Sequence, residues 1–151
     1  MRLTHASDSA IQILTYLAGI RGRQRATAEE ISEQTGLPPV FLNELIQKLV
    51  RPGFVSARPG TRGGFSLAMR VEDISILQVF ESIDGNSTSN ECLSVSGACP
   101  RSGHCDVQNQ LQTRRGEVEQ ILNGVTLDTL VRDGVEAHIA PLRWGLQCDR
   151  R

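Results

Sequence analysis

Apolar residues in the first fifty positions recur at the spacing of amphipathic helices. In residues 7–21 every third or fourth position is apolar, which predicts a helix whose buried face is made of Ala10, Ile13, Leu14, Leu17 and Ile20. The same period returns from Pro38 to about Val50. Proline is tolerated in the first turn of a helix, so this stretch predicts a helix with an inner stripe of Phe41, Leu45 and Leu49.

Residues 27–35, between these two segments, predict a shorter helix. Thr27 and Glu30 have the spacing of a capping box, in which each side chain accepts from the backbone N–H of the other residue. Ile31 is then an inward position, and Gly36 is a natural C-cap residue. Two short helices joined by a glycine turn have the pattern of a helix-turn-helix.

A glycine-rich hairpin follows the helix pair. Residues 54–57 and 64–67 are short strand-like runs, and the turn between them carries Arg58 and Arg62 among several glycines. Glycine lets a backbone approach DNA closely, and arginine binds phosphate or enters the minor groove. The order of helix pair and basic hairpin predicts a winged helix-turn-helix DNA-binding domain over residues 1–70.

The second half of the chain also has mainly helical patterns. A helix is expected from Asp73, with one face made of Ile76, Val79, Phe80 and Ile83. Residues 84–105 form a long polar loop, and loops of this length are usually functional or disordered. A longer helix over 106–123 then has an apolar stripe of Val107, Leu111, Val118 and Leu122, and a last short helix ends near Arg132. The fold class is therefore mainly α.

The second helix of the pair is narrow enough to enter the major groove and read base edges there. Asn43, Gln47 and Lys48 are its exposed polar side chains, and Val40 is placed to touch a thymine methyl group. Glu44 repels phosphate but can accept from a cytosine amino group. The candidate DNA contacts on helices and wing are Thr27, Val40, Asn43, Gln47, Lys48, Arg58, Thr61, Arg62 and Gly63.

Charge is distributed unevenly along the 151 residues, whose net charge is −1. Residues 1–70 carry nine Lys/Arg and five Asp/Glu, whereas residues 71–151 carry seven and twelve. This imbalance indicates that only the first half meets a polyanion, which we expect to be double-stranded DNA. No apolar run approaches the roughly 20 residues of a membrane span, and the N-terminus lacks a signal-peptide stretch, so we expect a cytoplasmic protein without membrane contact.

Three of the four cysteines, Cys92, Cys99 and Cys105, lie within fourteen residues. Thiolates suit iron–sulfur clusters and zinc, but these gaps are wider than the tight pairs of a zinc ribbon. Three ligands are one short of the usual four. The fourth ligand could be His104, Cys148 or a residue from elsewhere in the protein. If Cys148 is not a ligand, it is a free thiol. A thiol switch without metal is the alternative use of the three cysteines.

The order of several short motifs resembles the Rrf2 family of bacterial transcription regulators over about residues 1–132. These motifs are the Met1-Arg-Leu-Thr start, the Gly60-Thr-Arg-Gly-Gly wing, the Asp73-Ile-Ser helix start, the three loop cysteines, and Leu127 with Leu130 after the long helix. The resemblance implies a homodimer that binds a palindromic operator, with the long helix crossing the partner. It assigns residues 71–134 to cluster binding and dimerisation. Residues 135–151 lie beyond it and show no clear hydrophobic period, so we expect a mobile tail there.

The resemblance also bears on the fourth ligand. IscR-like members use a histidine three residues after the last cysteine, where this chain has Gln108. NsrR-like members use an aspartate of the first helix, supplied by the other subunit, and Asp8 stands at the matching place. RirA-like members have three cysteines without that aspartate. This chain is thus most similar to NsrR-like or RirA-like members, although six residues separate Cys92 from Cys99 where those relatives have four or five.

The expected metal ligands are therefore Cys92, Cys99, Cys105 and Asp8, which hold a 4Fe–4S cluster, with 2Fe–2S as the alternative. The expected function is a cluster-dependent repressor that senses nitric oxide, iron or redox state. A cluster-free thiol-switch repressor is the alternative function. We do not expect an enzyme, because the sequence contains no nucleotide-binding loop, catalytic triad or paired-carboxylate constellation.

Overall fold

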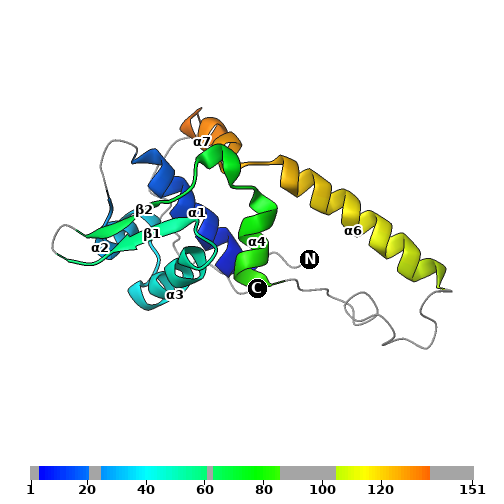
Figure 1. The fold of residues 1–151 in the computed structure, drawn as a ribbon, viewed down its shortest axis with the longest axis horizontal. Coiled ribbons are helices and arrows are strands. Elements are labelled where there is room, and N and C mark those ends of the chain that lie inside the picture. Colours follow the sequence, from blue (N-terminus) through cyan, green and yellow to red (C-terminus); the bar gives the residue numbers. More distant parts are fainter. Residues whose placement is uncertain (1–3, 21–24, 61–62, 86–104, 137–151) are drawn as a thin grey trace, which may run out of the picture.

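The computed structural model describes residues 4–20, 25–60, 63–85 and 105–136, and these residues form a mainly helical fold with one small sheet (Figure 1). In chain order the elements are α1 (His5–Gly19), α2 (Ala28–Thr35), α3 (Pro39–Val50), β1 (Val55–Arg58), β2 (Gly64–Leu67), the 3₁₀ turn η1 (Val71–Asp73), α4 (Ile76–Asp84), α6 (Asp106–Gly124) and α7 (Leu127–Glu136). No helix within these ranges is long and apolar enough to cross a membrane.

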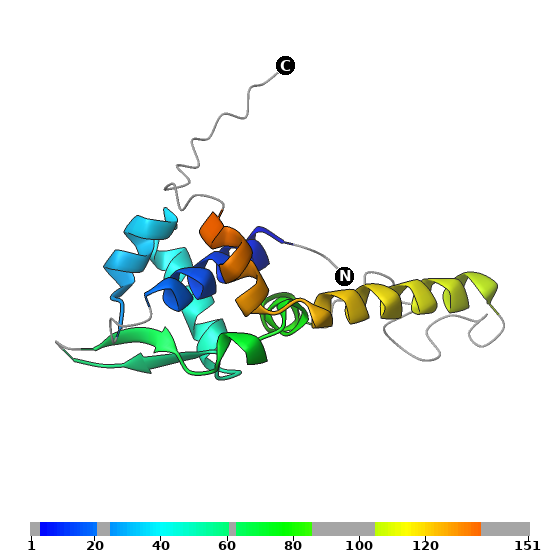
Figure 2. The ribbon, with the colours of Figure 1, turned by 90° about the horizontal axis from the view of Figure 1, so that it is seen from above.

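Helix α1 lies at the centre of the fold and is covered on several sides. It contacts α2, α3, α4, α7 and the strand β2, an arrangement that can be followed in Figure 2. Four of the five predicted residues are confirmed in the core: Ala10, Ile13 and Leu14 are fully buried, and Leu17 is nearly so. Ile20 follows the end of α1 and is only partly buried. Burying one aliphatic side chain of this size contributes about 1.5 to 3 kcal/mol, so α1 anchors the core.

The helix-turn-helix forms as its capping residues predict. The Thr27 N–H donates to Glu30 Oε2 at 2.9 Å, and the Glu30 N–H donates to Thr27 Oγ1 at 3.2 Å. Gly36 ends α2 in the left-handed conformation, at φ 70°. Side chains that carry a Cβ rarely adopt this conformation, so the tight turn into α3 depends on glycine.

Three helix boundaries differ from the sequence prediction. Helix α1 spans His5–Gly19 instead of 7–21, because Thr4 provides its N-cap. Helix α4 begins at Ile76 instead of Asp73, since Ser75 caps the helix and the residues before it form η1. Helix α7 continues to Glu136, past the predicted end near Arg132. Residues 137–151 of the predicted tail lie outside the described residues.

The inner face of α3 also differs in detail from the predicted stripe. Leu45 and Leu49 are fully buried as expected, and Leu42 and Ile46 are buried beside them. Phe41 is only half-buried, and its ring lies 5.9 Å from that of His5. The buried stripe of α3 therefore begins at Leu42 instead of the predicted Phe41, and Val40 and Asn43 lie on the outer side.

The wing is a two-stranded antiparallel sheet in which Val55 pairs with Leu67 and Arg58 with Gly64. Its second strand is attached to the segment before α2, because Ala26 and Phe65 exchange two backbone hydrogen bonds of 2.9 and 2.8 Å. Ala26 is buried, so these hydrogen bonds are shielded from solvent on its side. The wing is therefore fastened to the segment that leads into the helix pair.

A second backbone contact fixes the α6–α7 connection to the start of α4. The Ile76 N–H donates to the Val125 carbonyl at 2.9 Å, and the Leu127 N–H donates to the Ile74 carbonyl at 2.8 Å. Leu127 is fully buried, and α7 packs on α1. Helix α6 consequently extends away from the rest of the fold (Figures 1 and 2).

The substitution Gly64→Ala tests the attachment of the wing. Gly64 has φ +129°, and an added Cβ would lie 2.6 Å from the Ala26 carbonyl oxygen. We expect the free energy of unfolding, measured by urea denaturation, to fall by about 1 to 3 kcal/mol. The control is Gly116→Ala on α6, where nothing lies within 4 Å of the new Cβ and a gain of about 0.5 to 1 kcal/mol is expected. A Gly64→Ala protein as stable as the wild type would contradict the attachment.

Candidate DNA interface and metal ligands

The outer face of α3 presents a row of solvent-exposed side chains. Val40 is 84% exposed, and Asn43, Glu44 and Gln47 are also exposed. Residues three and four apart share one face of a helix, so this row is continuous along α3. An exposed amide such as that of Asn43 offers both a donor and an acceptor to a base edge.

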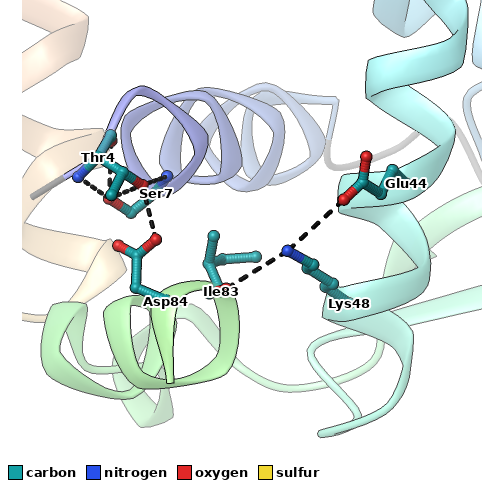
Figure 3. A network of polar contacts seen from close by, with 6 residues as sticks. All are labelled: Thr4, Ser7, Glu44, Lys48, Ile83 and Asp84. Carbon is teal, nitrogen blue, oxygen red and sulfur yellow. Dashed lines mark hydrogen bonds and ion pairs between the residues drawn. The ribbon is translucent and has the colours of Figure 1, made fainter. Parts of the chain in front are cut away.

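Lys48 lies apart from this row. Its Nζ donates to the Ile83 carbonyl oxygen at 3.4 Å and stands 3.7 Å from Glu44 Oε1. Figure 3 shows the ammonium group between α3 and the end of α4. The sequence predicts Lys48 as a DNA contact, whereas in this structure its side chain binds a neighbouring helix.

The wing turn is built so that only glycine fits at Gly63. Its N–H donates to the Gly60 carbonyl at 2.8 Å, and an added Cβ would collide with the Arg58 carbonyl oxygen. Arg58 ends β1 with its side chain exposed. Thr61 and Arg62, the other two predicted wing contacts, lie outside the described residues.

Thr27 has a structural task that accounts for its residue type. Its hydroxyl caps α2 while the side chain remains exposed at the helix N-terminus. An N-terminus of this kind favours a nearby negative charge such as phosphate. Replacement of the capping hydroxyl would therefore change the stability of α2 as well as any contact with DNA.

The structure describes two of the four predicted metal ligands. Cys105 is a half-buried free thiol at the N-cap of α6, and Asp8 is an exposed residue of the first turns of α1. Gln12 Nε2 donates to Asp8 Oδ2 at 3.1 Å. Cys92 and Cys99 lie outside the described residues. Within the described ranges, no three His, Cys, Asp or Glu side chains come together to hold a metal ion.

Sequence reasoning missed a polar network that joins α1 to the end of α4 (Figure 3). Thr4 Oγ1 donates to Asp84 Oδ1 at 2.6 Å, although the two residues are 80 positions apart. Ser7 completes the network, because its N–H donates to Thr4 Oγ1 and its hydroxyl donates to the Thr4 carbonyl. The Thr4-to-Ser7 spacing was a readable capping signal, but nothing local indicates Asp84 as the partner.

Comparison with solved structures shows the same fold elsewhere. The chain is similar to the IscR structure of T. potens, with a TM-score of 0.72, 21% identity, and 91% of each chain covered. It is also similar to CymR, the global cysteine regulator of B. subtilis, with a TM-score of 0.71, 19% identity, and coverage of 88% of this chain and 98% of that one. A winged-helix architecture carrying a long helix is therefore shared with transcription regulators.

Comparison with sequences identifies the family. The model of the Rrf2 family, described as iron-dependent transcriptional regulators, matches residues 3–133. NsrR of Bacillus subtilis is 27% identical over 134 residues, which cover 88% of this chain and 92% of that protein. A shorter match, 28% over 88 residues, covers 58% of this chain and 56% of YwgB, a putative regulator of the same organism.

These findings define the protein as a winged-helix DNA-binding transcription regulator and not an enzyme. The chain belongs to the Rrf2 family, as its motifs predict.

Proposed function

We propose that this protein is a repressor that binds a palindromic operator as a homodimer, with its DNA binding controlled by an iron–sulfur cluster. The observation that carries this proposal is the exposed row on α3 together with a wing whose first strand ends in Arg58, in a chain of the Rrf2 family. Residues 1–70 provide the DNA-binding unit in this proposal. Residues 71–134 provide the cluster and dimer unit.

The proposed dimer interface is the apolar face of α6. Val107 and Ile121 are each 67% exposed, and Leu111 and Val118 are exposed between them. Helical spacing places these four residues on one side of a helix that extends beyond the rest of the fold (Figure 1). A long, apolar helix stripe left open in one chain is typical of pairing with a second copy.

The proposed DNA contacts divide into base readers and phosphate binders. Asn43 and Gln47 are the base readers, because their amides lie on the exposed face of α3. Arg58, with Arg62 beyond the described residues, binds the phosphate backbone or the minor groove from the wing. Two copies related by a two-fold axis would read two half-sites, which is why a palindromic operator is expected.

The described residues fit the proposed cluster in their chemistry. Cys105 stands at the N-terminus of a nineteen-residue helix, whose dipole stabilises a negatively charged ligand such as a thiolate. The carboxylate of Asp8 is exposed and bound only by the flexible Gln12 amide among the described hydrogen bonds, so it is accessible to a second subunit. Cys92, Cys99 and Cys105 of one subunit with Asp8 of the other then supply four ligands for a 4Fe–4S cluster, with 2Fe–2S as the alternative.

A bound cluster would supply a metal centre that reacts with nitric oxide or oxidants, or that is lost when iron is scarce. Asp8 would hold its iron more weakly than a thiolate, because the iron of an iron–sulfur cluster favours soft thiolate ligands and a carboxylate is hard. Since α1 packs on both α2 and α3, release of Asp8 is expected to alter the position of the recognition helix. Nitric oxide is the first candidate signal, followed by iron and redox state.

A cluster-free thiol switch is the second candidate function. It is favoured by the free, half-buried thiol of Cys105 and by a fold that is equally similar to that of CymR, a cysteine regulator. An anaerobically purified protein that is colourless and iron-free, yet changes its DNA affinity with oxidant, would support this alternative over the cluster.

Two substitutions test the DNA interface by fluorescence anisotropy on a duplex that carries the protein's own promoter. Asn43→Ala should cost about 1 to 3 kcal/mol and relax the preference at one base position. Arg58→Ala should weaken binding to all sequences and reduce the salt slope of the binding constant by about one. The control is Arg132→Ala on α7. Unchanged affinity and salt slope in both test variants would refute this interface.

The substitution Asp8→Ala tests the fourth ligand. After anaerobic purification, we expect native mass spectrometry and visible absorbance to show a lost or altered cluster, because one ligand is missing. The response of DNA binding to nitric oxide should be lost with it. Cys148→Ala is the control, since this cysteine has no role in the proposed site. Cluster spectra and a nitric oxide response identical to those of the wild type would exclude Asp8 as a ligand.

A further inference from the structure

One ammonium group bridges the recognition helix and the end of α4. Lys48 Nζ stands 3.4 Å from the Ile83 carbonyl oxygen and 3.7 Å from Glu44 Oε1 (Figure 3). The Lys48 side chain is 37% exposed and that of Glu44 is 64% exposed. Both side chains therefore remain within reach of solvent, but the cation is held at the junction of two helices.

The end of α4, where Lys48 binds, carries several negatively charged or partially negative groups. The last four carbonyls of a helix have no intrahelical partner and form the negative end of its dipole, and Ile83 contributes one of them to α4. Asp84, the last residue of α4, adds a carboxylate there. Its Oδ1 accepts from Thr4, whereas its buried Oδ2 has no hydrogen-bond partner among the described atoms. A cation is therefore favoured at the end of α4.

The same cation also acts on the exposed row of α3. Glu44 is adjacent to Asn43 in the sequence and carries the negative charge of this row. An unpaired carboxylate on this face would repel DNA phosphates, and the Lys48 ammonium, one helical turn away, offsets part of its charge. The Ile83 carbonyl accepts from one of the three N–H donors of the Lys48 ammonium, and the Glu44 carboxylate lies 3.7 Å from the same nitrogen.

We propose that Lys48 is a positioning residue for DNA binding. By bridging Glu44 and the Ile83 carbonyl, it fixes α3 against the end of α4 and keeps the Glu44 carboxylate from the DNA backbone, and it does not itself bind phosphate. This inference rests on the proposed function, because it requires α3 to be the helix that enters the major groove of DNA. It replaces the role that the sequence predicts for Lys48.

The end of α4 also has a second fastening, through Asp84 to the N-cap of α1. Asp84 and Gly85 are the last described residues before Cys92 and Cys99 in the sequence. Lys48 therefore connects the recognition helix to the end of α4, the last described element before Cys92 in the sequence.

The test compares DNA binding of Lys48→Met with that of the wild type as a function of salt, on the promoter duplex and on an unrelated duplex of equal length. Methionine keeps the apolar stem and removes the charge. We expect affinity to fall about twofold to fivefold, as for other exposed ion pairs, with a salt slope that changes by clearly less than one, because no phosphate contact is lost. The loss should shrink in the Glu44→Gln background, where no carboxylate remains to be neutralised.

The matched control is Arg132→Met on α7, which breaks another i,i+4 ion pair, with Asp128, away from α3. It should leave both affinity and slope unchanged. Circular dichroism and the thermal midpoint establish that each variant is folded, and Lys48→Gln replaces Lys48→Met if the latter does not fold. Rescue by Glu44→Gln is a readout that general destabilisation would not produce.

A salt slope reduced by about one, with an equal loss of affinity in the Glu44 and Glu44→Gln backgrounds, would overturn the inference and make Lys48 a direct phosphate contact. Unchanged affinity in Lys48→Met would overturn it as well. A wild-type protein that binds neither duplex would instead refute the proposed function, and the inference would fall with it. The outcomes thus separate the two claims.

Discussion

Burial of α1 is the constraint on which the rest of this structure depends. The helix contacts α2, α3, α4, α7 and β2, and its apolar face is closed to solvent. Each of those elements is therefore positioned relative to the others through α1. The backbone contacts of Ala26 with Phe65 and of Leu127 with Ile74 then attach the wing and the long helix to this assembly. A shift of α1 is therefore expected to shift α2, α3 and β2, which form the DNA-binding surface.

The position of Asp8 follows from this constraint. One side of α1 is buried in the core, and Asp8 lies in its first turns on the exposed side. Thr4, at the start of the same helix, holds Asp84 at the end of α4, and Lys48 holds α3 to the adjacent Ile83 carbonyl. The start of α1, the end of α4 and the recognition helix thus meet in one region (Figure 3). Asp8, the proposed metal ligand, lies in the turn of α1 that follows Thr4, at the same end of the helix as this region.

Sequence motifs predicted the features that depend on neighbouring residues in the chain, such as helix caps and turns. The Thr27 capping box, the left-handed Gly36 and the wing glycines were readable because backbone geometry restricts residue type at those positions. The Thr4–Asp84 bond and the direction of Lys48 were not, since both depend on residues brought together only by the packing of α1, α3 and α4. For the metal site, residue chemistry indicated Cys105 and the family resemblance indicated Asp8, but the described part of one chain does not assemble a complete set of ligands.

The central claim is that α1 of one subunit completes a metal site on the cysteines of the other. Co-expression of Asp8→Ala and Cys105→Ser subunits with different tags, followed by tandem anaerobic purification, isolates the mixed dimer. That dimer contains one intact pairing of three cysteines with the aspartate of the opposite subunit. Native mass spectrometry should then show one stable cluster in the mixed dimer and none in either parent dimer. A mixed dimer without a cluster, prepared alongside a cluster-containing wild type, would contradict the account.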